Sequence, residues 1–183
     1  MSIQIPSPLA NHKDRFRALL SQRKDMPGDL AEFGVYNGGN TCALAELEPT
    51  RRVWAFDTFD GMPAPEFSKD NGDHDEPGKF APEVPWVKVF QQFPNIVPMV
   101  GRFVYTLKNI PSDVKFPLVY MDCDLYESYK QVLRYLSPRH LLPNSAIVID
   151  DYGCCEGAKR AVDMWMKWYD LKWEDDCTVI WKG

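Results

Sequence analysis

The amino-acid sequence predicts an α/β fold, in which a mostly parallel sheet carries helices on both faces. Short, nearly continuous apolar segments recur along the chain, as expected for strands that are buried on both sides. Amphipathic segments with a helical period stand between them. Glycines or aspartates directly follow several of the apolar segments, at the positions where parallel strands end and ligands bind. Alternation of this kind is typical of a sheet with helices on both sides.

The N-terminal half of the chain begins this alternation. Residues 14–23 carry apolar side chains on one face and predict a short helix. The apolar run at residues 30–35 predicts a strand that breaks at a cluster of glycines. Residues 41–47 predict a helix that Pro49 stops, and residues 53–59 predict the second strand. These segments form the first strand–helix–strand unit.

The C-terminal half continues the same pattern. Further strands are expected at residues 96–103, 117–122, 146–149 and 178–181. One helix is expected between the fourth and fifth strands, because the apolar side chains there form a single stripe. It is expected to end before Pro138, because the residue before a proline disfavours helical geometry. That stripe comprises Leu125, Tyr129, Val132, Leu133 and Leu136. Another helix is expected at about residues 157–168, with the stripe Ala158, Ala161, Val162 and Trp165.

Residues 62–85 interrupt the alternation. They are rich in proline, glycine and acidic residues and contain no strand pattern. A loop of this length within a compact domain is usually functional or disordered. Because it follows the second strand, it leaves the sheet at the edge where ligands bind, and we interpret it as a lid. The alternative is a surface insertion without a role, in which His74 is a solvated histidine and not a substrate contact.

The composition indicates one globular domain that spans residues 1–183. The formal net charge is −5 and no basic run is present, which disfavours nucleic acid as a partner. No apolar stretch approaches the roughly 20 residues that span a bilayer, so no membrane partner is expected. Five cysteines without a framework spacing indicate reduced thiols and a cytoplasmic location. We interpret the adjacent Cys154 and Cys155 as packing residues, with a redox pair as the alternative.

The turn after the first strand is the first candidate cofactor site. Glu32 stands two residues before Gly34, and Tyr36, Asn37 and Gly38 follow. The spacing differs from G-x-G-x-x-G, so a nicotinamide or flavin dinucleotide is not indicated. A carboxylate here suits a cofactor with a positive amino group, such as the methionine end of S-adenosylmethionine, better than a diphosphate. A glycine that only makes a tight turn is the alternative.

Two further strand ends complete the expected cofactor site. Asp57, with Thr58 beside it, ends the second strand about 20 residues after the glycine turn, where an acid can bind both ribose hydroxyls. Gly101, Arg102 and Phe103 end the third strand, where the glycine gives access to an adenine and the phenylalanine can pack on it. The alternatives are a helix cap at Asp57 and a core role for Phe103. Together, the order and spacing favour a nucleoside cofactor.

Four aspartates follow two neighbouring strands. Asp122 and Asp124 end the fourth strand, and Asp150 and Asp151 end the fifth. At one sheet edge these carboxylates would repel one another, and a bound divalent cation is the simplest resolution. Oxygen ligands suit Mg²⁺, Mn²⁺ or Ca²⁺ better than zinc, and capping of the following helices is the alternative. Strand alternation lets Asp122, Asp150 and Asp151 hold the ion while Asp124 remains as a general base.

These motifs together resemble those of the macrocin O-methyltransferase family. The resemblance runs from about residue 32 to residue 163. Its carriers are EFGVYNGG (32–39), FDTFDGMP (56–63), GRF (101–103), MDCDLYES (121–128), IDDYG (149–153) and GAKRAVD (157–163). The DCDLYES and IDDY motifs at this separation are specific, whereas the glycine turn alone is not. The resemblance implies a Rossmann-like class I methyltransferase fold.

Members of this family use S-adenosylmethionine and magnesium to methylate sugar hydroxyls of antibiotics. By position, the resemblance implies that Asp122, Asp150 and Asp151 bind Mg²⁺ (or Mn²⁺) and that Asp124 takes the proton of the acceptor hydroxyl. The cofactor residues that it implies are Glu32, Gly34, Gly38 and Asp57. The stretch before the first strand is shorter than in the family pattern, where it contributes to substrate pockets. The partner is therefore expected only to be a small-molecule hydroxyl acceptor, with a sugar as the family default. A homodimer is also expected.

Two other functions fit parts of this pattern. Magnesium-dependent phosphatases of the aspartyl-phosphate kind also place D-x-D after one strand and D-D after another. Their D-x-D lies near the start of the chain, however, and here it lies at Asp122. A non-catalytic module that binds S-adenosylmethionine is the second alternative, against which the intact carboxylate cluster argues. We therefore expect an S-adenosylmethionine-dependent O-methyltransferase.

Overall fold

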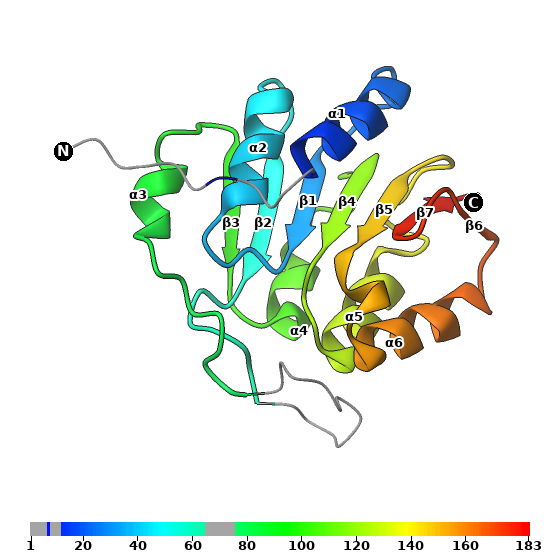
Figure 1. Cartoon of the computed structure of the whole chain (residues 1–183). Coiled ribbons are helices and arrows are strands. Elements are labelled where there is room, and N and C mark those ends of the chain that lie inside the picture. Colours follow the sequence, from blue (N-terminus) through cyan, green and yellow to red (C-terminus); the bar gives the residue numbers. More distant parts are fainter. Residues whose placement is uncertain (1–6, 8–11, 65–75) are drawn as a thin grey trace.

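The structure is a computed structural model that describes residue 7 and residues 12–64 and 76–183. Its described part contains one seven-stranded sheet in the order β3-β2-β1-β4-β5-β7-β6 (Figure 1). The strands are β1 (Leu30–Phe33), β2 (Val53–Asp57), β3 (Ile96–Val100), β4 (Leu118–Met121), β5 (Ala146–Ile149), β6 (Leu171–Trp173) and β7 (Thr178–Trp181). The helices are α1 (His12–Gln22), α2 (Gly39–Leu47), α3 (Trp86–Phe90), α4 (Phe103–Thr106), α5 (Tyr126–Leu136) and α6 (Glu156–Met166), with short 3-10 turns at Leu107–Asn109 and Asp150–Gly153.

The sheet is mostly parallel, as the sequence predicts. Strands β3, β2, β1, β4 and β5 run parallel, whereas β7 pairs antiparallel with both β5 and β6. In the register of the central strands, Phe33 of β1 lies beside Met121 of β4, and Met121 lies beside Ile149 of β5. The three strands therefore end level with one another, and the residues that follow them meet at one edge of the sheet.

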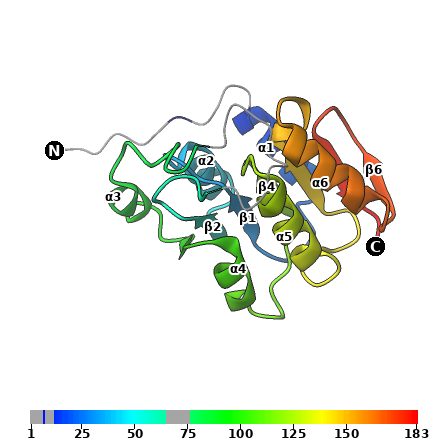
Figure 2. The same ribbon diagram turned by 90° about the horizontal axis from the view of Figure 1, so that it is seen from below.

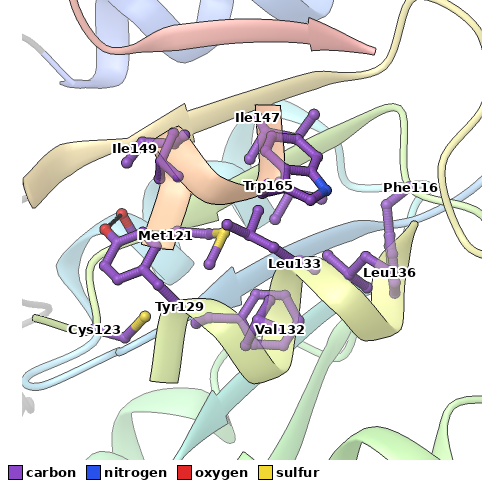
Figure 3. Packing of buried hydrophobic residues seen from close by; sticks show 14 of the residues in the cluster. Phe116, Met121, Cys123, Tyr129, Val132, Leu133, Leu136, Ile147, Ile149 and Trp165 are labelled. Carbon is purple, nitrogen blue, oxygen red and sulfur yellow. Dashed lines mark hydrogen bonds between the residues drawn. The ribbon is translucent and has the colours of Figure 1, made fainter. Parts of the chain in front are cut away.

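Helices cover both faces of the sheet (Figures 1 and 2). Helices α1 and α2 pack on one face, and α4, α5 and α6 pack on the other. Side chains alternate along β4, so Tyr120 joins the core beneath α1 and α2, whereas Val119 and Met121 join the core beneath α5 and α6. Figure 3 shows this second core, where Tyr129 of α5 lies beside Met121 of β4.

The predicted apolar stripes are buried and fix the helices to the sheet. Phe16, Leu19 and Leu20 of α1 are buried. The stripes expected for α5 and α6 are also buried along their whole length. Full burial of one large apolar side chain stabilises a fold by about 1.5–3 kcal/mol. Within the ranges 12–64 and 76–183, each helix is too short or too polar to span a bilayer.

Several strands end earlier than the apolar pattern predicts. β1 ends at Phe33, because Gly34 takes a left-handed φ of 84°. β2 ends at Asp57, two residues before the left-handed Phe59. Phe103, expected at the end of the third strand, instead begins α4. Residues just after a strand can be buried without making strand hydrogen bonds. An apolar pattern in the sequence indicates burial, so it extends past the end of the strand.

Three short elements were not predicted, namely α3, α4 and β6. They contain five, four and three residues, which is too few to show a helical or strand period. The remaining boundaries differ by small shifts. α1 begins at His12 and not at residue 14, and α6 spans Glu156–Met166.

Part of the expected lid, residues 65–75 with His74, lies outside the described residues. The two ends of this loop are joined by backbone hydrogen bonds. Met62 N donates to Lys79 O at 2.7 Å, and Gly78 N donates to Met62 O at 2.9 Å. The chain therefore leaves the carboxyl edge of the sheet and returns to the same place.

Candidate active site

A cavity of about 310 Å³ opens at the carboxyl edge of the sheet. Its walls come from the turns after β1 to β4, from α5 and from the chain on either side of the long loop. The predicted site residues that line it are Gly34, Tyr36, Asp57, Thr58, Arg102, Phe103, Asp122 and Asp124. The predicted site residues that do not line it are Glu32, Asn37, Gly38, Gly101, Asp150 and Asp151. One space thus connects the glycine turn with the aspartates after β4.

Gly34 allows the ends of β1 and β4 to approach closely. Its φ of 84° is unfavourable for residues with a side chain. A Cβ added at Gly34 would lie only 1.7 Å from the carbonyl oxygen of Asp122. On the other side, Gly34 N donates to Phe56 O at 3.0 Å. A glycine is therefore required where the turn after β1 touches the segment that contains Asp122.

Asp57 joins the end of β2 to the turn after β1. Its Oδ2 accepts hydrogen bonds from Val35 N at 2.6 Å and Tyr36 N at 3.1 Å. Its Oδ1 accepts one from Phe59 N at 2.7 Å. The carboxylate also lines the cavity, and each of its oxygens can accept more than one hydrogen bond. Asp57 therefore shapes the turn in addition to any contact with a ribose.

Glu32 lies behind the cavity, in the core of the protein. It is 1% exposed, and its carboxylate accepts a hydrogen bond from the Thr41 hydroxyl of α2. Burial raises the pKa of Glu32 well above its ordinary value, and the nearby Asp122 and Asp57 carboxylates raise it further. A buried acid of this kind gains from a positive charge placed near it.

The other predicted cofactor residues shape the turns around the cavity. Asn37 Oδ1 accepts a hydrogen bond from Glu83 N at 2.8 Å, which connects the glycine turn to the chain that returns from the long loop. Gly38 has φ of 82°, and a Cβ there would lie 2.7 Å from the ring of Phe90. Gly101 N donates to Asp57 O at 2.8 Å. Their contacts support a role in positioning the cavity walls.

Aromatic side chains make much of the cavity wall apolar. Tyr36 and Phe80 meet edge to face, with ring centroids 5.9 Å apart. Phe103 packs edge to face on Phe33 at 5.6 Å, so it reaches the cavity from a fixed position in the core. An apolar wall with a few polar groups is typical of a small-molecule site.

The aspartates after β4 are held in a low-dielectric environment. Burial raises the pKa of Asp122 well above its ordinary value, and repulsion from Asp151, Asp150 and Asp124 adds to it. Burial raises the pKa of Asp124 to about 7, with repulsion from Asp151 adding to the shift and Lys79 opposing it. A divalent cation would relieve this repulsion.

Asp151 is fixed by the protein on both sides. Its Oδ2 accepts a hydrogen bond from Asp124 N at 2.9 Å and lies 2.8 Å from the Tyr129 hydroxyl. Its Oδ1 lies 3.8 Å from Cys155 Sγ. Burial raises the pKa of Asp151, and the hydrogen bonds that it accepts oppose this shift.

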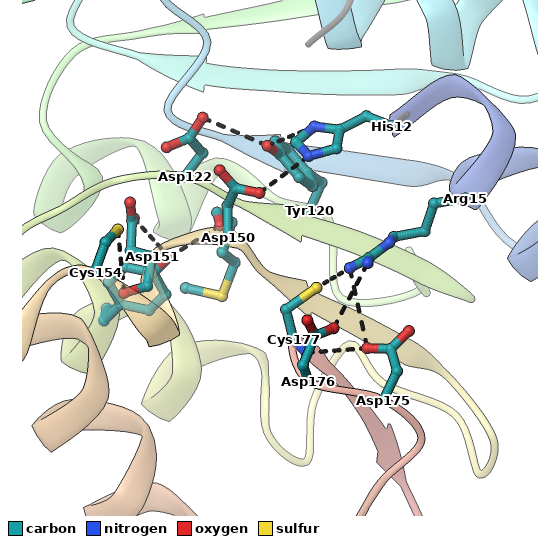
Figure 4. A network of polar contacts seen from close by, with 12 residues as sticks. His12, Arg15, Tyr120, Asp122, Asp150, Asp151, Cys154, Asp175, Asp176 and Cys177 are labelled. Carbon is teal, nitrogen blue, oxygen red and sulfur yellow. Dashed lines mark hydrogen bonds and ion pairs between the residues drawn. The ribbon is translucent and has the colours of Figure 1, made fainter. Parts of the chain in front are cut away.

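Asp150 points in another direction, toward the first helix. Its Oδ1 lies 3.2 Å from Nε2 of His12, as Figure 4 shows. Nδ1 of the same imidazole lies 3.1 Å from the hydroxyl of Tyr120. Tyr120 in turn lies in β4, two residues before Asp122.

The donor chemistry at this edge fits a divalent cation. Asp122, Asp150 and Asp151 offer only carboxylate oxygens, which Mg²⁺ and Mn²⁺ prefer. Among the residues that the structure describes, the sets of three ligand atoms within 4.8 Å of one another are Asp151–Cys154–Cys155 and Asp175–Asp176–Cys177. The predicted ligands Asp122, Asp150 and Asp151 do not form such a set. The His12 contact uses Oδ1 of Asp150, and the Asp124 amide contact uses Oδ2 of Asp151, so each carboxylate keeps a second oxygen for an ion.

Three residues around the aspartates were not identified from the sequence. Tyr129 was expected only as a core residue, yet its hydroxyl reaches Asp151. Tyr120 lies in an apolar run, and its position two residues before Asp122 was the available signal. His12 precedes the expected start of the first helix, and no sequence pattern connects it with Asp150.

A family model described as macrocin O-methyltransferase (TylF) matches residues 10–182. One relative is 8-demethyl-8-(2,3-dimethoxy-alpha-L-rhamnosyl)-tetracenomycin-C 4'-O-methyltransferase of Streptomyces olivaceus, to which the chain is 33% identical over 142 residues. The aligned region covers 69% of this chain and 54% of that protein. A second relative is demethyldecarbamoylnovobiocin O-methyltransferase of Streptomyces niveus, to which the chain is 32% identical over 165 residues. This aligned region covers 80% of this chain and 61% of that protein. The chain thus spans less than two thirds of the length of both relatives.

The solved structure of the O-methyltransferase NovP is similar across nearly the whole chain. It superposes with a TM-score of 0.76 at 26% identity and covers 94% of this chain and 79% of NovP. This similarity confirms the predicted Rossmann-like class I methyltransferase fold. Together with the match over residues 10–182, it shows that the chain belongs to the macrocin O-methyltransferase family.

Proposed function

We propose that this protein transfers a methyl group from S-adenosylmethionine to a hydroxyl of a sugar-bearing small molecule, with the help of a divalent metal ion. The observation that carries this proposal is the single cavity lined both by the glycine turn after β1 and by Asp122 and Asp124 after β4. A nucleoside cofactor at the turn and an acceptor beside the aspartates would therefore meet. The rhamnosyl acceptor named for the Streptomyces olivaceus relative supports a sugar as the acceptor class.

The cofactor would occupy the part of the cavity between β1, β2 and β3. Asp57 would bind the ribose hydroxyls, and Phe103 would pack on the adenine beside Arg102. Tyr36 and Thr58 lie in the same wall. Glu32, although behind the wall, would add a favourable field for the positive amino group.

A divalent cation, Mg²⁺ or Mn²⁺, would be held by Asp122, Asp150 and Asp151. When bound, such an ion supplies Lewis-acid polarisation of the acceptor oxygens. The donors are all carboxylate oxygens, and their mutual repulsion favours a cation at this edge of the sheet. The charge of the site and the family resemblance both support metal dependence.

Asp124 would act as the general base. The acceptor oxygen attacks the methyl carbon, the carbon–sulfur bond breaks, and the hydroxyl proton passes to the Asp124 carboxylate. Burial raises the pKa of the Asp124 carboxylate above its ordinary value, which makes it a stronger proton acceptor. The apolar wall at Phe80 and Phe103 excludes water from the reacting atoms.

Isothermal titration with S-adenosylhomocysteine, with and without Mg²⁺, tests the cofactor site directly. We expect saturable binding that weakens strongly in Asp57→Ala. Asp60→Ala is the matched control, because Asp60 is an exposed carboxylate three residues away that does not line the cavity. An acceptor screen with rhamnosides then tests the transfer. If the unaltered protein binds no S-adenosylhomocysteine in either condition, the proposed function is wrong.

A further inference from the structure

We propose that His12 of α1 is a positioning residue for the metal centre, which holds Asp150 through a hydrogen bond from an imidazole that Tyr120 orients. This inference rests on the proposed divalent metal. Its structural basis is a continuous chain of polar contacts between the ends of β4 and β5, drawn in Figure 4. The chain joins Tyr120, His12 and the expected metal ligand Asp150, and His12 lies on a helix that is distant from Asp150 in sequence.

The contacts of this chain are short enough to orient each group. His12 Nε2 lies 3.2 Å from Asp150 Oδ1, and His12 Nδ1 lies 3.1 Å from the Tyr120 hydroxyl. The Tyr120 hydroxyl also lies 3.5 Å from Asp122 Oδ2, which is too far to orient that carboxylate. A single imidazole therefore connects Asp150, after β5, with Tyr120 of β4.

The proton positions follow from the shorter contacts. The Tyr120 hydroxyl donates to Nδ1 of His12, since this contact is shorter than the one to Asp122. Nε2 of the neutral imidazole then carries the ring proton, and this N–H donates a hydrogen bond to Asp150 Oδ1. Tyr120 thereby fixes the imidazole tautomer that can hold Asp150. Second-shell hydrogen bonds of this kind orient metal ligands in many proteins.

Burial makes this arrangement specific. Tyr120 is fully buried, so its hydroxyl gains from a protein partner that replaces water. The rings of His12 and Phe16 both approach Tyr120 with centroids 5.3 Å away, nearly perpendicular in the case of Phe16. These ring contacts fix the position of the imidazole against Tyr120, in the first turn of α1.

Apolar side chains other than His12 attach α1 to the sheet. Phe16, Leu19 and Leu20 of the same helix are buried in the core and anchor it. The His12 side chain is 15% exposed and lies at the edge of this packing. We therefore expect the two nitrogens of His12 to orient Asp150 and to contribute little to the free energy of unfolding. This difference distinguishes a positioning role from a structural role.

The test measures Mn²⁺ and Mg²⁺ binding by titration calorimetry on the full chain saturated with S-adenosylhomocysteine. His12→Phe keeps a ring on Tyr120 but removes both nitrogens. We expect it to weaken metal binding by about 10–100-fold, the usual effect of removing a second-shell partner. Binding of S-adenosylhomocysteine without metal should remain unchanged. His12→Gln, whose amide can donate to Asp150, should recover part of the metal affinity, and Tyr120→Phe should lose part of it.

Leu20→Ala is the control for a purely structural effect. It removes buried packing of α1 without touching the rings of His12 and Tyr120, so it should lower the melting temperature without changing metal affinity. Equal metal affinity in His12→Phe and the unaltered protein would overturn the positioning role while leaving the metal proposal intact. If the unaltered protein binds neither ion, the metal proposal and this inference are both wrong, although cofactor binding can still hold.

Discussion

Asp151 Oδ2 accepts a hydrogen bond from the backbone N–H of Asp124 at 2.9 Å, which joins the end of β5 to the end of β4. Asp124 takes a left-handed φ of 54°, a conformation that aspartate and asparagine tolerate better than most residues. The backbone of Asp124, and not its side chain, is thus the part held by Asp151. Its carboxylate is left at the wall of the cavity.

This relationship makes Asp124→Asn a clean test of the general base. Asparagine keeps the backbone hydrogen bond to Asp151 and tolerates the same φ, so the fold should be retained. We expect kcat to fall by about 10²–10⁴-fold, the usual contribution of a general base. Affinity for S-adenosylhomocysteine, measured by calorimetry, should remain within the range of the unaltered protein. Normal turnover in this variant would exclude Asp124 as the base.

The position of the aspartates could be predicted from the sequence, but their orientation could not. Parallel strands of similar length end level, so Asp122 and Asp150 were expected at one edge, and the register of β4 and β5 places them there. The alternation argument fails beyond Met121, because β4 ends there and Asp124 is left-handed. The contact between His12 and Asp150 depends on where α1 packs, which no local pattern specifies.

The same limit applies to the cofactor turn. Its glycines were predicted as points of access for a ligand, yet the close neighbour of Gly34 is the backbone of Asp122. Burial of the α5 and α6 stripes was predictable because it depends only on helical period. Contacts between turns depend on the sheet order, which a single sequence does not fix.

Gly34→Ala should destabilise the protein severely. The added Cβ would lie 1.7 Å from Asp122 O, a backbone atom that cannot move without breaking the β1–β4 edge. The left-handed φ alone costs about 1–2 kcal/mol for a residue with a side chain. We expect loss of soluble folded protein or a large drop in the urea midpoint.

Two matched glycine variants separate the causes of this loss. Gly78→Ala has a left-handed φ of 82° but open space around the new Cβ, so it should show only the backbone cost. Gly153→Ala also has open space and is not among the left-handed glycines, so it should leave the urea midpoint nearly unchanged. If Gly34→Ala is no less stable than Gly78→Ala, the close approach to Asp122 does not limit the fold.

Asp150→Ala should abolish the response to magnesium. The proposed metal loses one of three carboxylate ligands, so turnover should fall and should no longer rise with added Mg²⁺. The measurement is the initial rate of methyl transfer across a Mg²⁺ series after treatment with EDTA. Asp113→Ala is the control, because Asp113 is exposed and precedes the opposite end of β4. Magnesium-stimulated turnover that matches the unaltered protein would remove Asp150 from the ligand set.

His140 should make the free energy of unfolding depend on pH. It is 2% exposed, and burial lowers its pKa below the ordinary value of 6.5, with Lys115 and Arg139 also lowering it and the Val114 carbonyl opposing them. Well above pH 6.5 the imidazole is neutral in both the folded and the unfolded chain. As the pH falls below 6.5, the unfolded chain binds a proton before the folded one does. The free energy of unfolding should therefore decrease with falling pH, until the folded protein is protonated as well.

His140→Asn isolates this contribution, because its amide nitrogen can replace Nδ1, which lies 2.8 Å from Val114 O. The variant should be less stable at pH 7.5, since asparagine fills less of the space between Phe116 and Tyr135. Its free energy of unfolding, from urea titrations between pH 5 and 7.5, should nevertheless fall less steeply as the pH decreases. One proton accounts for a slope of at most about 1.4 kcal/mol per pH unit. Identical slopes in the two proteins would show that His140 titrates alike in the folded and unfolded chains, contrary to its burial.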